Sequence, residues 1–224
     1  MAGPSRSLTS GGIFYSLARF SLPVLLTLFL QALYGGVDLL VVGQFASTAD
    51  VSGVSTGSML LSTFTMLVTG LSMGPTVTVG EAIGSGSPKE AGRAVLAGLT
   101  LLGSLAVLLT LGLALFAQPL AALLDAPPEA MDHTVAYIRI CGLGMVFIVA
   151  YNFLGAVLRG AGDAKTPLYT VAVACAVNIV GDLLLVAGFH LGAAGAAIAT
   201  VAAQAVSVLL SLFFLCRKPL PFAM

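Results

Sequence analysis

The sequence predicts an all-α membrane protein built as a bundle of six transmembrane helices. Of its 224 residues, 58% are hydrophobic and only 8% are charged, whereas an ordinary soluble domain carries roughly 25% charged residues. A soluble protein of this size could not cover its surface with nine basic and nine acidic side chains. Long apolar stretches separated by short connectors rich in turn-forming residues complete the pattern.

Six stretches reach the length of about 20 mostly apolar residues that a transmembrane helix needs. In chain order, the predicted spans are residues 19–43, 53–79, 94–116, 135–158, 168–189 and 193–216. They leave no room for a soluble domain, so we expect residues 1–224 to form a single transmembrane lobe. Residues 1–18 lack the continuous apolar core of a signal peptide, and we expect the first span to be retained as an anchor.

The first, second and sixth spans carry features that affect helix packing. Pro23 lies in the first span and can bend it, because proline removes an intrahelical hydrogen bond. The sixth span opens with the nearly all-small segment 192–200. The second span holds three glycine pairs at four-residue spacing: Gly53 and Gly57, Gly70 and Gly74, and Gly80 and Gly84. Since lipid gives helices no hydrophobic reason to associate, we expect close contacts at these small residues.

The basic residues predict the orientation. Eight of the nine fall on one side of the predicted spans, while the opposite connectors carry acidic residues or no charge. By the positive-inside tendency, both termini are predicted to be cytoplasmic. Arg139, early in the fourth span, is the exception. The eight residues are Arg6, Arg19, Lys89, Arg93, Arg159, Lys165, Arg217 and Lys218.

Several function classes find no support. No basic surplus is available to bind nucleic acid. The three cysteines, Cys141, Cys175 and Cys216, lie in apolar stretches and are expected to serve packing. No cofactor is expected, and the sequence does not predict an enzyme. His133 and His190 lie far apart in connectors with no partners for a metal site.

Two enzymatic alternatives can be weighed against specific residues. Segment 160–166 superficially resembles a phosphate-binding loop, but Ala164 stands where such a loop has glycine before its lysine. Intramembrane hydrolysis would use two buried aspartates sharing a proton. The residues preceding Asp182 are Ile-Val-Gly, which do not form the Gly-x-Gly-Asp segment we would expect of such an enzyme.

A few polar residues interrupt the apolar spans. Asp38 lies deep in the first span and Asp182 deep in the fifth, with Asn178 one turn before Asp182. A charged side chain at this depth costs roughly 2.5–3.5 kcal/mol on insertion scales, so both acids need an explanation. In the first span, a spacing of four, three and four places a polar row on one helical face, which we expect to line a cavity. That row is Thr27, Gln31, Tyr34 and Asp38.

These groups suit a small hard cation. In the sixth span, Ala196, Thr200 and Gln204 recur at four-residue spacing. Carboxylate, amide and hydroxyl oxygens favour hard ions, and two neighbouring acids would titrate as a pair that loads and releases H⁺ or Na⁺. For Thr200, a hydrogen bond to the carbonyl of Ala196 is an alternative, and Gln204 is expected to join helices.

The residues taken together resemble the multidrug and toxin extrusion (MATE) family of cation-coupled antiporters. The resemblance runs along essentially the whole chain, and its order and spacing are more specific than any single segment. It rests on Pro23 and on segments 34–43, 69–74, 159–167, 178–185 and 192–200.

This resemblance implies a fold, a site and an activity. Family members have twelve spans in two similar six-helix lobes and expel cationic amphipathic drugs or toxins in exchange for Na⁺ or H⁺ by alternating access. The cation site implied for the N-terminal lobe maps onto Asp38, Asn178, Asp182 and Thr200, with the carbonyl of Ala196 as a further ligand, and no other metal is expected. Gln31 and Tyr34 would line the cavity, and Pro23 would bend the first span. The expected location is the plasma membrane or the bacterial inner membrane.

The resemblance also implies a second lobe, because the sequence stops at Met224 where a family member continues. We expect either that this chain is a fragment or truncated product, or that two copies form a homodimer. Two other functions remain open: a lobe without transport activity of its own, and a flippase for lipid-linked precursors. The latter needs cationic side chains for pyrophosphate, and only Arg139 could approach that role.

Overall fold

The computed structural model describes residues 13–217, and these form helices with no strand among them. Arg6 and Lys218, two of the residues used to predict orientation, lie outside the described part. The long helices are α1 (Ile13–Phe45), α2 (Thr48–Gly84), α3 (Pro88–Leu115), α5 (Met131–Leu143), α6 (Met145–Gly160), α7 (Lys165–Asp182) and α8 (Gly192–Arg217). Shorter elements are α4 (Ala117–Leu123), a 3-10 turn at Pro128–Ala130 and a π-helical turn at Leu183–Gly188.

Each predicted span falls on one helix or on two consecutive helical segments. Five helical segments are long and apolar enough to cross a membrane, and α5 and α6 together make a sixth, bent by 48°. The bend lies at Gly144, where a Cβ would run into the side chain of Val201 on α8. The all-α class is therefore confirmed, and the long apolar helices indicate a multi-pass membrane protein.

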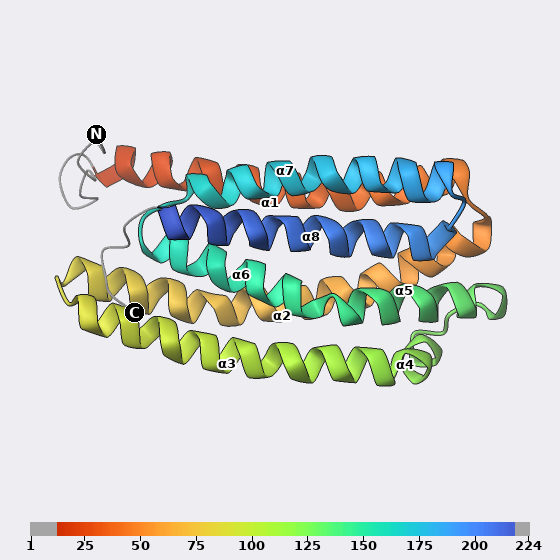
Figure 1. The fold of residues 1–224 in the computed structure, drawn as a ribbon, viewed down its shortest axis with the longest axis horizontal. Coiled ribbons are helices and arrows are strands. Elements are labelled where there is room, and N and C mark those ends of the chain that lie inside the picture. Colours follow the sequence, from red (N-terminus) through yellow and green to blue (C-terminus); the bar gives the residue numbers. More distant parts are fainter. Residues whose placement is uncertain (1–12, 218–224) are drawn as a thin grey trace.

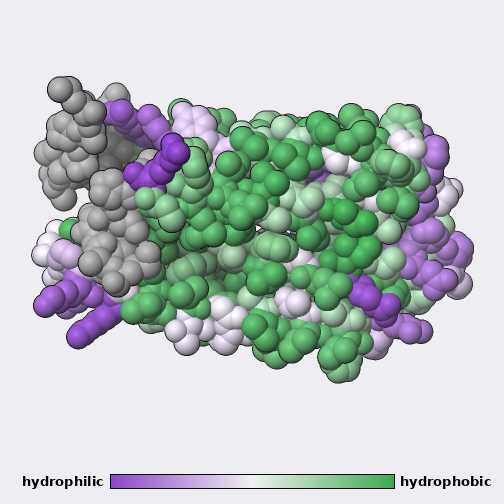
Figure 2. Space-filling view, in the orientation of Figure 1, coloured by the Kyte–Doolittle hydropathy of each residue, from purple (hydrophilic) through white to green (hydrophobic). Residues whose placement is uncertain are grey.

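The helices lie roughly along one axis, and Figure 1 shows both described chain ends at the same end of the bundle. α7 packs against α1 and α8, while α2 packs against α3, α5 and α6. A core of small and β-branched side chains, including Val42, Val54 and Val68, fills the interior. Apolar side chains cover the middle of the face in Figure 2, and hydrophilic residues gather toward its two ends. Such a surface is suited to lipid.

The glycines of α2 divide into packed and unpacked positions. A Cβ on Gly53 would lie 2.7 Å from Cβ of His133, and a Cβ on Gly57 would meet the ring of Tyr137. These two glycines therefore bring α2 against α5, as predicted from their spacing. For Gly70 and Gly74 the prediction is wrong, because a Cβ there would meet nothing within 4 Å.

The helices begin earlier than the apolar spans predict, and α2 and α5 show why. Ser47 caps α2: its hydroxyl accepts from the backbone N–H of Asp50, and its own N–H donates to the Asp50 carboxylate. This reciprocal capping box extends α2 outward past the apolar stretch. α5 likewise starts at Met131, so His133 lies in its first turn and not in a connector.

Candidate functional site

The polar row predicted on α1 faces the interior of the bundle. Thr27 and Asp38 are buried, and Gln31 and Tyr34 are partly buried. Gln31 donates to the hydroxyl of Tyr151 on α6 over 3.5 Å. At one end of the row, the Thr27 hydroxyl donates to the carbonyl of Pro23 over 2.8 Å. α1 runs without interruption through Pro23.

Tyr34 joins α1 to α8. Its hydroxyl accepts a hydrogen bond of 3.0 Å from the Gln204 amide. This contact agrees with the expectation that Gln204 joins helices. Tyr34 also lies one turn from Asp38, so the hydrogen bond holds α8 beside the acid.

Asp182 and Asn178 supply the α7 side of the site. Both side chains are fully buried, and they lie one turn apart on the same face of the helix. The helix becomes π-helical directly after Asp182. Single π-helical turns inside longer helices are frequent at functional sites.

Three helices bring their polar groups together at Asp38. The Thr200 hydroxyl on α8 donates to Oδ2 of Asp38 over 3.0 Å, so it does not bond to the carbonyl of Ala196. The side chains of Asp182 and Asn178 on α7 lie near enough to Asp38 to influence it electrostatically. Asp38 is 4% exposed and Asp182 is 0% exposed. Both acids therefore face each other inside the bundle and not the lipid.

Most polar atoms of this cluster have no partner among the described residues. Asp38 donates nothing and accepts only through Oδ2, which leaves Oδ1 without a donor. Both carboxylate oxygens of Asp182 and both amide atoms of Asn178 also lack a partner. Leaving buried polar groups unpaired costs about 1–3 kcal/mol each, and more for charged groups. Five such atoms in one place leave hydrogen-bonding capacity that a polar or charged guest could satisfy.

The remaining predicted residues take supporting positions. Ala196 is fully buried one turn before Thr200 on α8. α7 and α8 approach closely next to the site, since a Cβ on Gly181 would lie 2.9 Å from Cβ of Ala199. This close packing fixes Thr200 relative to Asp182.

Three residues make contacts that the sequence analysis did not predict. Tyr151 pairs with Gln31, and Asn152 pairs with Thr69 on α2 over 3.0 Å. Asn152 is a polar residue inside an apolar span. The same signal identified Asn178 and could have identified Asn152 from the sequence. The third is His133, whose Nδ1 lies 2.8 Å from Oδ1 of Asp50. The sequence did not predict this contact, because separation along the chain does not reveal which helix ends meet.

The MatE family model matches residues 23–184 of the chain. Among related proteins, the probable multidrug resistance protein YpnP of Bacillus subtilis is 28% identical over 216 residues, which are 96% of this chain and 48% of YpnP. The multidrug export protein MepA of Staphylococcus aureus (strain NCTC 8325 / PS 47) is 24% identical over 214 residues, 92% of this chain and 46% of MepA.

Solved structures share the fold. A crystal structure of MATE in complex with MaD3S superposes with a TM-score of 0.90 at 23% identity, covering 100% of this chain and 50% of that one. An outward-facing MATE family transporter of the MOP superfamily gives a TM-score of 0.85 at 24% identity, covering 92% and 46%. The chain thus spans about half the length of these relatives.

Proposed function

Because the chain belongs to the MatE family of multidrug efflux transporters, we propose that it serves as one six-helix half of a cation-coupled antiporter in the cell membrane. The coupling ion is Na⁺ or H⁺, and the exported substrate is a cationic amphipathic drug or toxin. Proteins of this family are transporters and not enzymes, so the site between α1, α7 and α8 is assigned to ion binding.

The observation that supports this proposal most directly is the set of unpartnered atoms at Asp38, Asn178 and Asp182. Two carboxylates buried side by side repel each other when both are charged. A cation between them, or a proton on one of them, removes this repulsion and supplies the missing partner. The Thr200 hydroxyl already orients one carboxylate and can add an oxygen ligand.

The donor set favours a hard ion. Its members are carboxylate, amide and hydroxyl groups, which suit Na⁺ or H⁺. Among the described residues, no cluster of three or more His, Cys, Asp or Glu side chains could hold a metal ion. The carbonyl of Ala196 is the further ligand that we propose for Na⁺.

Coupling follows from differential affinity. An ion shifts a conformational equilibrium only when it binds one state more tightly than the other. Ion binding neutralises Asp38 and so weakens the attraction of the cavity for a cationic substrate. It also changes the contacts of Asp38 with α7 and α8, which allows α1 to move, with Pro23 as the bending point.

Transport by alternating access requires a second lobe that rocks against this one. We propose that it comes either from the rest of a longer chain or from a second copy. The mass of the purified protein in detergent, measured by light scattering, separates these cases: a stable dimer supports the second, and a monomer supports the first.

The test uses the chain reconstituted in liposomes with the cationic dye ethidium and an imposed Na⁺ or pH gradient. We expect ion-driven ethidium transport to fall at least about tenfold in Asp38→Asn and Asp182→Asn and to persist in Glu90→Gln, which removes an exposed acid at the start of α3. Undiminished transport in both aspartate variants would reject the assigned site. If the unmodified chain transports nothing, the change in its Tm with added Na⁺ or with pH is measured instead. A change in Tm indicates that the chain binds the ion without transporting it.

A further inference from the structure

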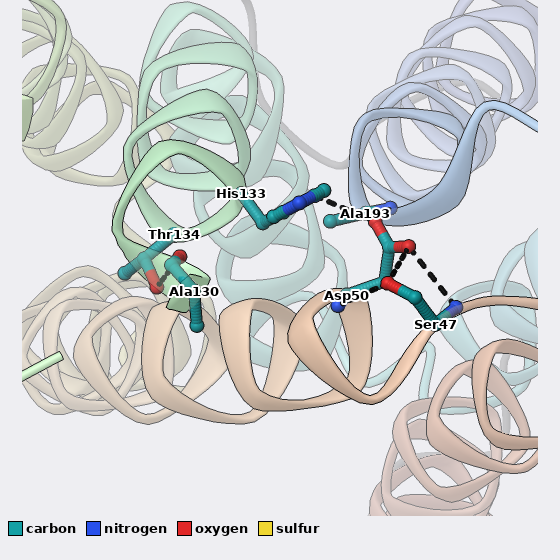
Figure 3. A network of polar contacts seen from close by, with 6 residues as sticks. All are labelled: Ser47, Asp50, Ala130, His133, Thr134 and Ala193. Carbon is teal, nitrogen blue, oxygen red and sulfur yellow. Dashed lines mark hydrogen bonds and ion pairs between the residues drawn. The ribbon is translucent and has the colours of Figure 1, made fainter. Parts of the chain in front are cut away.

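Outside the candidate cation site, the carboxylate of Asp50 joins three helices (Figure 3). The first turns of these helices lie at the end of the bundle opposite the described chain ends (Figure 1). Oδ2 of Asp50 accepts from the Ser47 backbone N–H over 3.1 Å and from the Ser47 hydroxyl over 2.6 Å. Its Oδ1 accepts from the backbone N–H of Ala193 over 2.9 Å and lies 2.8 Å from Nδ1 of His133. One side chain therefore holds the first turns of α2, α5 and α8 together.

Two glycines let the backbones approach this carboxylate. Gly192 has φ +53°, and a Cβ there would collide with the Asp50 side chain. Gly53 brings α2 against the backbone of α5 at His133 and Thr134. Asp50 itself is 8% exposed. The carboxylate also lies at the N-terminal ends of two helices, where the partial positive charge of the helix stabilises an anion.

The junction lies close in sequence to both sides of the candidate cation site. Asp38 precedes the end of α1 at Phe45 by seven residues, and Ser47 follows directly after the turn. Thr200 lies seven residues after Ala193, or about 10 Å along the axis of α8. Because Asp50 ties the start of α8 to the turn that ends α1, it controls how Thr200 stands relative to Asp38.

His133 adds a dependence on pH. Its side chain is 40% exposed, and histidine is the residue that gains its charge as the pH falls from about 8 to about 5. The other titratable side chains near this end are Glu129 before α5, Asp132 on α5, Asp125 in the preceding connector and His190 before α8. Among the described residues, His133 is the ionisable side chain within ion-pair distance of Asp50.

We propose that Asp50 is a positioning residue that sets the Thr200–Asp38 contact of the cation site, and that protonation of His133 tightens its hold on α5 and α8. The proposal rests on the proposed function only in naming that site as the one that binds the ion. A charged imidazole attracts the Asp50 carboxylate more strongly than a neutral imidazole does, over the 2.8 Å between Nδ1 and Oδ1.

The first experiment measures Tm of the purified chain between about pH 5.5 and pH 8. In the unmodified chain, we expect Tm to fall as the pH rises. The fall should be smaller in His133→Arg, which stays charged, and in His133→Gln, which stays neutral. His133→Arg should hold the high value and His133→Gln the low one. His190→Asn is the matched control, because His190 has φ 56° and Asn tolerates that conformation. An unchanged pH profile in both His133 variants would overturn the switch.

The second experiment tests positioning without relying on transport. In Asp50→Asn we expect the Ala193 amide to exchange its hydrogen about tenfold faster, because it loses a charged acceptor. Dicyclohexylcarbodiimide modifies buried carboxyl groups. We expect the rate at which it labels Asp38 and Asp182 in Asp50→Asn to differ at least about threefold from the rate in the control variant Glu90→Gln. If Asp50→Asn does not fold, Ser47→Ala removes only one donor and takes its place.

The outcomes separate the two proposals. Changed exchange and labelling in Asp50→Asn support the positioning role even if Asp38→Asn retains ion-driven transport, which would reject only the proposed function. Unchanged exchange and labelling reject the positioning role, whatever the transport assay shows.

Discussion

The hydroxyl of Thr200 donates to Oδ2 of Asp38 over 3.0 Å, although 162 residues separate them in the chain. The contact joins α8 to α1 directly beside Asp182 on α7. It also turns one oxygen of Asp38 toward α8 and leaves the other without a donor. A hydroxyl that fixes one oxygen of a buried acid orients the second oxygen for a guest, so Thr200 is the natural place to begin testing the site.

Thr200→Val keeps the volume of the side chain and removes the hydroxyl. We expect it to destabilise the chain by about 1–3 kcal/mol, because Asp38 loses its donor. The stabilisation of Tm by Na⁺ or by acid should also weaken. Thr200→Ser, which retains the hydroxyl, should preserve both. Equal ion responses in the two variants would show that the hydroxyl takes no part in the site.

Asn178→Leu and Asn152→Leu should change stability in opposite directions. The Asn178 amide is fully buried without a partner, so replacing it with an apolar group of similar size should raise Tm while abolishing the ion response. The Asn152 amide donates to the carbonyl of Ile148 and accepts from Thr69. Its replacement should lower Tm. A fall in Tm for Asn178→Leu comparable to that for Asn152→Leu would argue against an unsatisfied amide at Asn178.

Leucine substitutions along α2 should separate packed glycines from unpacked ones. Gly57→Leu would force a side chain into the ring of Tyr137, at a cost of about 1–3 kcal/mol or more from overpacking. Gly70→Leu meets no neighbour within 4 Å and should leave the Tm of the isolated chain within a few degrees of the original. Thermal unfolding of the two variants, measured side by side, checks this. Similar losses would contradict the packing of α2 on α5.

The orientation predicted from the basic residues can be checked with the native cysteines. Cys216 is exposed, one residue before the end of α8, whereas Cys141 and Cys175 are buried. A membrane-impermeant maleimide should therefore label the chain at Cys216 only after cells are permeabilised, if that end of the bundle is cytoplasmic. Cys216→Ser is the control and should abolish labelling. Labelling of intact cells would reverse the predicted orientation.

The sequence was sufficient for the class of protein and for the candidates inside it. Low charge and six apolar stretches predicted the all-α membrane bundle, and the helices confirm it. The cost of burying acids in lipid selected Asp38 and Asp182, and helical periodicity placed Tyr34 on the same face as Asp38. Both arguments are local, because they depend only on hydropathy and on residues within one helix. The assignment of these residues to a cation site stays a prediction.

The tertiary structure decided which of these faces meet. Every span is apolar, and lipid does not distinguish one apolar helix from another, so periodicity could not reveal that α1, α7 and α8 converge at Asp38. The same limit explains why Gly57 is packed and Gly70 is not, and why Thr200 bonds to Asp38 rather than to its own helix. The contact between His133 and Asp50 likewise depends on where separate helix ends come to rest. Such contacts arise from side-chain fit between distant segments, and no single stretch of sequence contains that fit.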